Sequence, residues 1–156
     1  MRVIAGSARS LKLKTLEGIE TRPTTDRIKE TLFNMISPQM YDCIFLDLFA
    51  GSGAIGIEAL SRGAAKAVFV DNSKEALSCI HQNLEKTHLA DRAIVIGQDC
   101  AGAIHALDAK KMHFDIIFMD PPYQLNAEKE VLTAIADSKI ADEDTQIIIE
   151  ATLDRE

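Results

Sequence analysis

The chain has 156 residues, of which 47% are hydrophobic and 26% are charged, and its formal net charge is −7. These values are ordinary for one soluble globular domain, and no apolar run approaches the roughly 20 residues of a membrane span. The N-terminus lacks the apolar core of a signal peptide, and the three cysteines show no CxxC spacing. We therefore expect a cytoplasmic protein with reduced thiols and no membrane partner.

The basic residues gather at the start of the chain. Residues 1–30 carry a net charge of +3 and the remainder carries −10. Residues 2–6 and 10–15 alternate as two short strands around a turn, which predicts an N-terminal hairpin arm over residues 1–22. A basic arm on an acidic body is typical of nucleic-acid binding, but edge lysines on a solvated hairpin explain the same charges.

A leading helix is predicted over residues 23–37. Thr24 or Thr25 is a suitable N-cap, and Asp26 lies favourably in the first turn. The expected apolar face consists of Ile28, Leu32, Met35 and Ile36.

From residue 43 the pattern alternates between strands and helices. The expected strands are 43–48, 66–71, 93–98, 114–119 and 145–151. The expected helices are 53–62, 73–87, 100–109 and 127–138, with Asn72 as N-cap of the second. This alternation predicts an α/β fold with a doubly wound, Rossmann-like parallel sheet over residues 43–156.

An acidic residue stands at or just past the end of each of the first four strands: Asp47, Asp71, Asp99 and Asp120. Ligands of open α/β sheets bind outside the carboxyl ends of the strands. We expect these four strand-end carboxylates to face one crevice, although a single aspartate at such a place is a common turn residue.

The glycine turn (residues 49–56) contains Gly51, Gly53 and Gly56, which match GxGxxG, and Asp71 lies twenty residues after Gly51. This spacing also occurs in dinucleotide-binding enzymes. However, Asp47 and its acidic neighbours would repel a pyrophosphate, because like charges about 4 Å apart cost about 4 kcal/mol at an effective dielectric near 20. S-adenosylmethionine is net positive and suits the acidic crevice.

Each carboxylate has a predicted role toward that cofactor. Asp47 would serve the ammonium of the aminoacyl end, directly or through water, and Asp71 would accept both ribose hydroxyls. Asp99 would accept the adenine amino group, with the backbone of Cys100 beside it. The glycines allow the backbone to approach closely.

The fourth strand ends in Asp120-Pro121-Pro122-Tyr123. The prolines stiffen the loop and remove two backbone donors, which leaves acceptors facing the crevice. Acceptors on both hydrogens of an exocyclic amine would expose its lone pair to a methyl group, and Tyr123 could stack on a flipped base. We predict these four residues as the catalytic set.

Together these motifs resemble the class I S-adenosylmethionine-dependent N-methyltransferases. Two further blocks, residues 22–27 and 30–34, make the chain resemble the bacterial 16S rRNA (guanine-N2) methyltransferase family along essentially its whole length. The resemblance implies methylation of the guanine exocyclic amine in 16S rRNA or a small-subunit particle. It also implies an RNA-binding set, which consists of Arg9, Lys12, Lys14 and Arg27.

The predicted cofactor-binding set is Asp47, Phe49, Gly51, Ser52, Gly53, Asp71, Asn72, Asp99, Cys100, Arg22 and Thr24. No metal site is expected, because the four histidines show no ligand spacing. Alternatives are a DNA or free-base amino methyltransferase, an RNA-binding assembly factor without activity, and a dehydrogenase.

One departure concerns the C-terminus. The resemblance implies an antiparallel hairpin after the fifth strand, and this hairpin is missing here. We therefore expect an uncovered apolar edge at residues 147–149. This edge is explained by a truncated or incomplete chain, or by a partner chain that covers it. We expect the full-length chain to be a monomer.

Overall fold

The computed structural model describes residues 1–16, 26–121 and 127–150. Its centre is a five-stranded parallel sheet in the order β3-β2-β1-β4-β5. The strands are β1 (Ile44–Leu48), β2 (Lys66–Val70), β3 (Ala93–Ile96), β4 (Ile116–Met119) and β5 (Gln146–Ile149). The α/β fold class is confirmed, and each strand is shorter than predicted.

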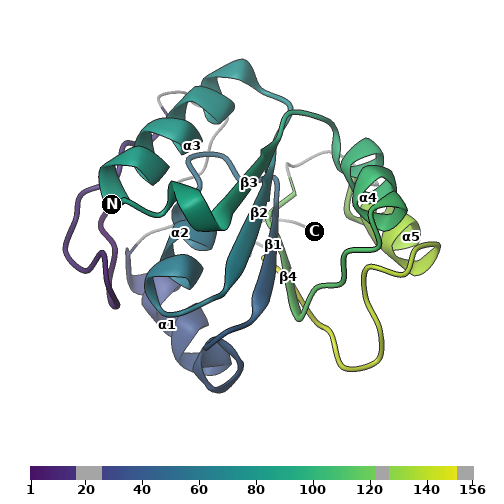
Figure 1. The fold of residues 1–156 in the computed structure, drawn as a ribbon, viewed down its shortest axis with the longest axis horizontal. Coiled ribbons are helices and arrows are strands. Elements are labelled where there is room, and N and C mark those ends of the chain that lie inside the picture. The colour runs from purple at the N-terminus through teal and green to yellow at the C-terminus, as the bar shows by residue number, and fades with distance from the viewer. Residues whose placement is uncertain (17–25, 122–126, 151–156) are drawn as a thin grey trace, which may run out of the picture.

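Helices cover both faces of the sheet. The α-helices are α1 (Asp26–Ile36), α2 (Ala54–Ser61), α3 (Lys74–Thr87), α4 (Cys100–Ala109) and α5 (Ala127–Ala136), and short 3₁₀ turns span Ser37–Gln39 and Ala90–Arg92. Helices α1, α2 and α3 lie on one side and α4 and α5 on the other (Figure 1). Two apolar clusters fill these two layers. None of the helices in the described residues is long and apolar enough to cross a membrane.

The chain reverses its direction of winding beside β1. Strands β2 and β3 extend the sheet one way, and β4 then pairs with the free side of β1. Leu48 pairs with both Val70 and Met119. The next residues, among them Asp71 and Asp120, therefore follow β2 and β4 at the same level, on either side of the end of β1. This is the switch point at which ligands of open α/β sheets bind.

The predicted apolar face of α1 is confirmed at Ile36 and Leu32, which pack in or against the core, and is wrong at Ile28 and Met35. Ile28 is 47% exposed and Met35 is 71% exposed, whereas Lys29, Phe33 and Ile36 are buried. The helix turns a lysine inward because a buried carboxylate, that of Glu58, pairs with it at 3.2 Å. Periodicity alone favours an apolar side chain at such a place, so the prediction put Ile28, and not Lys29, on the buried face. The predicted N-caps Thr24 and Thr25 lie outside the described residues.

The described part of the N-terminal arm, residues 1–16, folds back on itself with one antiparallel β-bridge in place of two extended strands. The two segments pair antiparallel around a bridge between Arg2 and Lys12, with backbone hydrogen bonds from Val3 to Leu11, from Ser10 to Val3 and from Leu13 to Met1. Val3, Ala8 and Leu13 are buried in the core beneath α1 and α2. The arm is therefore docked on the body through its apolar side chains, and its basic side chains remain outside.

The structure corrects the predicted N-cap of α3 and agrees with the predicted exposed edge at β5. Ser73, and not Asn72, caps α3, since its hydroxyl accepts a hydrogen bond from the Ala76 amide at 3.3 Å. Strand β5 pairs with β4 alone within the described residues, and Ile147 and Ile149 on it are 38% and 36% exposed.

Candidate active site at the carboxyl ends of the strands

The glycine turn leads from β1 into α2 through a sharp change of direction. Phe49 has a left-handed φ of 58°, which is unusual for a bulky residue, and Gly53 has a φ of 82°. At Gly56 a β-carbon would lie 2.4 Å from Cε2 of Phe69, so only glycine allows α2 to approach β2 this closely. The sequence thus builds a tight turn at the switch point.

Asp71 joins this turn to the start of α3. One of its carboxylate oxygens accepts the Gly51 amide at 2.9 Å, and the other accepts the Ser73 amide at 3.0 Å. Each oxygen retains a second lone pair. Asp71 is therefore held in place by backbone donors and can still accept hydroxyl groups of a ligand.

Asp47 is buried beneath the turn. It is 1% exposed, and its Oδ2 accepts the Gly56 amide at 3.0 Å. Burial raises the pKa of Asp47 to about 8, the Gly56 hydrogen bond opposes that rise, and the charges of Asp71 and Asp120 add to it. These three carboxylates thus act on one another across a common space.

Asp99 and Cys100 stand at the start of α4. Asp99 caps this helix, because its Oδ1 accepts the Gly102 amide at 2.8 Å. Burial raises the pKa of the Cys100 thiol to about 12, opposed by a hydrogen bond from the Phe49 backbone and reinforced by Asp71, Asp99 and Asp47. The thiol is therefore a packing group rather than a nucleophile. All four strand-end carboxylates lie around one region.

The predicted catalytic set is only partly described. Asp120 follows β4 directly and is half-buried, and the next residue, Pro121, is buried. Pro122 and Tyr123 lie outside the described residues, as do Arg22 and Thr24 of the cofactor-binding set. Arg27, of the RNA-binding set, is exposed on α1.

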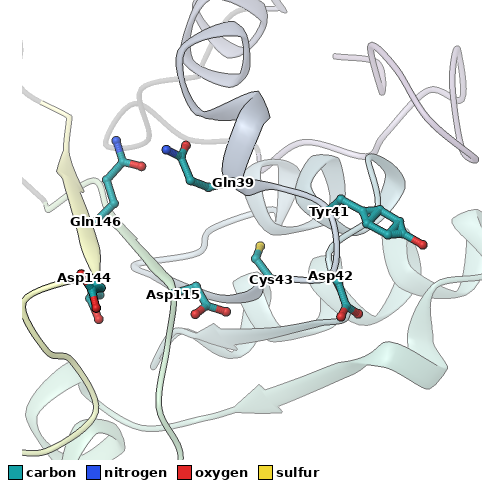
Figure 2. A pocket seen from close by; sticks show the side chains of 8 residues that line it. Gln39, Tyr41, Asp42, Cys43, Asp115, Asp144 and Gln146 are labelled. Atoms are coloured by element: carbon teal, nitrogen blue, oxygen red, sulfur yellow. The ribbon is translucent and has the colours of Figure 1, made fainter.

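A hollow at the opposite end of the sheet has different chemistry. It lies where the chain enters β1, β4 and β5, and Figure 2 shows the side chains that line it. They are Gln39, Tyr41, Asp42, Cys43, Asp115, Asp144, Thr145 and Gln146. Because parallel strands share one direction, this hollow is separated from the four carboxylates by the length of the sheet.

The chemistry of the donor set tests the predicted cofactor. An anionic pyrophosphate at the glycine turn would meet the carboxylates of Asp71 and Asp120, whose repulsion of a further negative charge already raises the pKa of Asp47. A ligand with an ammonium and a sulfonium would relieve that repulsion. The acidic donor set therefore fits S-adenosylmethionine better than a dinucleotide.

Comparison with known proteins also indicates a methyltransferase. The family described as Conserved hypothetical protein 95 matches residues 1–156. A Bacillus subtilis protein, YlbH, named as a candidate rRNA methyltransferase, is 44% identical over 150 residues, covering 96% of this chain and 82% of its own. The Ribosomal RNA small subunit methyltransferase D of Haemophilus influenzae is 35% identical, covering 99% of this chain and 80% of its own.

The chain belongs to this family of rRNA methyltransferases. The predicted family is therefore confirmed. A solved structure described as a candidate methyltransferase from Escherichia coli superposes with a TM-score of 0.83 at 35% identity, covering 97% of this chain and 82% of that one. The methyltransferase fold and the class of enzyme are likewise as predicted.

This family member also contains a buried ionic cluster that the sequence analysis missed. Glu58 of α2 accepts the amides of Ile4 and Ala5 at 2.9 and 3.1 Å and the Arg62 Nε at 2.7 Å. Lys29 pairs with it and also donates to the Arg2 carbonyl. Burial lowers the pKa of Lys29 and Glu58 opposes this fall. A glutamate inside an otherwise apolar helix was the available signal.

The cluster fixes the arm on the body. Removal of one partner from a buried ion pair typically costs about 3–5 kcal/mol, because the other charge stays buried. The first residues of the chain are thereby held against α1 and α2, which sets the direction in which Arg9, Lys12 and Lys14 are presented. All three side chains are exposed.

Proposed function

We propose that this enzyme transfers a methyl group from S-adenosylmethionine to the exocyclic N2 amine of a guanine in 16S rRNA of the small ribosomal subunit. The observation that carries the proposal is the convergence of four carboxylates on the glycine turn at the switch point, with Asp120-Pro121 at its border. A member of an rRNA methyltransferase family with this site has the parts that such a reaction needs.

The cofactor side is built from three elements. Asp47 would accept from the ammonium, Asp71 from the ribose hydroxyls, and Asp99 from the adenine amine. The amide of Gly51 is already engaged by Asp71, so this turn is preorganised before a ligand enters. When bound, S-adenosylmethionine supplies a methyl group on a positively charged sulfur.

The substrate side centres on Asp120. Its position directly after β4 sets it beside the turn that follows β1. A carboxylate that accepts from the amine would hold the nitrogen lone pair toward the methyl group, and Pro121 keeps the backbone after it rigid. The predicted roles of Pro122 and Tyr123, to hold the amine and stack on the base, belong to this proposal. Positioning and electrostatics supply the rate enhancement, without a covalent enzyme adduct.

The arm would contact the RNA backbone. Arg9, Lys12 and Lys14 are exposed on it, and a β-carbon placed on Gly51 would lie 3.9 Å from Cδ1 of Leu16. The arm thus reaches the cofactor turn, and phosphate contacts along it would orient the substrate without reading its sequence. The predicted roles of Arg22, Thr24 and Arg27, to line the cofactor and RNA side of the crevice, belong to this proposal.

The test is to map modified guanines in 16S rRNA by mass spectrometry, with and without this protein. Purified enzyme should then methylate small-subunit particles from the strain that lacks it, and should leave duplex DNA unmodified. Transfer to DNA with none to rRNA would support the amino methyltransferase alternative. A cytoplasmic location and a monomeric state stay predictions.

A further inference from the structure

A single buried amide of α3 connects the arm to the cofactor turn. Asn83 is 1% exposed. Its Oδ1 accepts the Lys14 amide at 2.8 Å, and its Nδ2 donates to the Lys14 carbonyl at 2.9 Å and to the Ser52 carbonyl at 3.0 Å. Both backbone groups of Lys14 and one carbonyl of the glycine turn are therefore held by one side chain.

This arrangement uses the chemistry of an asparagine fully. The side-chain amide offers two N–H donors and an acceptor oxygen, and all are engaged. Alanine would remove the partner of the Lys14 amide and of the Ser52 carbonyl, and aspartate would set a carboxylate against two carbonyl oxygens. The Cys79 thiol, one helical turn earlier, also donates to the Lys14 carbonyl at 3.3 Å.

The connection continues to a predicted ligand group. Ser52 follows Gly51, whose amide donates to Asp71 at 2.9 Å. A continuous path thus runs from Asp71 through the turn and Asn83 to Lys14, whose side chain is exposed on the arm. Any shift of the turn when the ribose is bound would be transmitted to the arm through the hydrogen bonds of the buried Asn83 side chain.

We propose that Asn83 is a positioning residue that couples the two substrates, so that cofactor binding at the glycine turn strengthens RNA binding by the arm. The inference rests on the proposed function, which assigns the arm to RNA. Asn83 touches neither substrate and acts only through Ser52 and Lys14. Because coupling is reciprocal, RNA would strengthen cofactor binding by the same factor.

The test measures RNA affinity by fluorescence anisotropy with a labelled 16S rRNA transcript, with and without saturating S-adenosylhomocysteine. The wild-type enzyme should bind RNA roughly fivefold or more tightly in its presence, within the usual range of coupling between sites. Asn83→Ala should retain RNA binding and lose most of this gain. Gln82→Ala is the matched control and should keep the wild-type gain, since Gln82 accepts from the exposed Lys14 ammonium at 3.2 Å and donates to the Ser78 hydroxyl at 3.0 Å, away from the glycine turn.

Hydrogen exchange on the wild-type enzyme tests the link without a variant that could fail to fold. Addition of S-adenosylhomocysteine should slow exchange of the Lys14 amide, which is bonded to Asn83. The Ile44 amide, bonded to Asp115 at the opposite end of the sheet, should not change. Unchanged exchange at Lys14 would overturn the proposal.

The two proposals fail in different ways. Equal gains in wild type and Asn83→Ala, or no gain in wild type, would overturn the coupling while methylation of 16S rRNA still supports the function. Absence of both RNA binding and rRNA methylation in the wild-type enzyme would overturn the function and, with it, the coupling.

Discussion

Both ends of the sheet are acidic, yet only one has the organisation of an active site. At the carboxyl end, Asp47 is buried and lies within electrostatic reach of Asp71 and Asp120. At the amino end, Asp42, Asp115 and Asp144 are exposed around the hollow of Figure 2. Asp115 caps β1 there by accepting the Ile44 amide at 2.8 Å.

The difference lies in what burial does to a carboxylate. An exposed aspartate is hydrated, so neighbouring charges cost little, whereas a buried one is disfavoured as an anion until a cation or donors approach it. Acidic composition alone therefore does not identify a site. A buried carboxylate that faces other carboxylates at the switch point does indicate a site, because a cationic ligand relieves the repulsion between them.

The largest expected effect is on methyl transfer, and it should distinguish the carboxyl end of the sheet from the amino end. Asp120→Ala should lower the rate of methyl transfer to small-subunit particles roughly 100- to 1000-fold, the usual loss when one preorganised polar group is removed from a reacting centre. Asp115→Ala, the matched change at the amino end, should leave the rate unchanged. Methyl incorporation at saturating substrates measures both, and a fully active Asp120→Ala enzyme would contradict the assigned mechanism.

A smaller effect concerns cofactor affinity. Asp71→Asn should weaken S-adenosylhomocysteine binding roughly 10- to 100-fold, since hydrogen bonds to a charged group contribute about 1.5–3 kcal/mol. Isothermal titration calorimetry measures the change. Asp144→Asn in the hollow serves as the control, and equal affinities of the two variants would show that Asp71 is only a structural link between the turn and α3.

The free energy of unfolding should depend on pH through Asp47. The pKa of Asp47 is raised to about 8 in the folded chain, so the folded state holds a proton that the unfolded state has released. Stability from this group is complete at low pH, below the ordinary aspartate pKa, and is lost as pH rises through about 8. Asp47→Asn should flatten this decline.

Urea unfolding of the ligand-free chain between pH 5 and about 8.5 measures the slope. The Asp115→Asn variant should keep the decline that Asp47 causes. The same proton should be released when a cationic cofactor binds below pH 8, and calorimetry in buffers of different ionisation enthalpy detects it. A slope equal in wild type and Asp47→Asn would mean that the buried carboxylate is not the source.

The smallest effect is expected beside the hollow. Tyr41 is 81% exposed, so Tyr41→Ser should change the free energy of unfolding by no more than about 0.5 kcal/mol. Methyl transfer should also be unchanged. A marked loss of activity would show that the amino end takes part in function and would break the contrast between the two ends.

The sequence by itself determined the fold class and the family, and it predicted the four strand-end carboxylates. Alternating apolar strands and helices can pack only as a parallel sheet with helices on its faces, and residues at the carboxyl ends of such strands must meet at one edge. The acids there, with the glycine turn, were enough to favour a cationic cofactor over a dinucleotide. These features are local or periodic, so they can be read along the chain.

Only the tertiary structure decided how charges are paired across long separations. Lys29 and Glu58 are 29 residues apart in the sequence, where each would be assigned to the surface, but the fold buries them as a pair. Lys14 and Asn83 are likewise joined only by the fold. Periodicity assigns polar residues to solvent, and it fails where a polar side chain buries itself to satisfy a distant backbone. The anchored arm and its link to the glycine turn arise in this way.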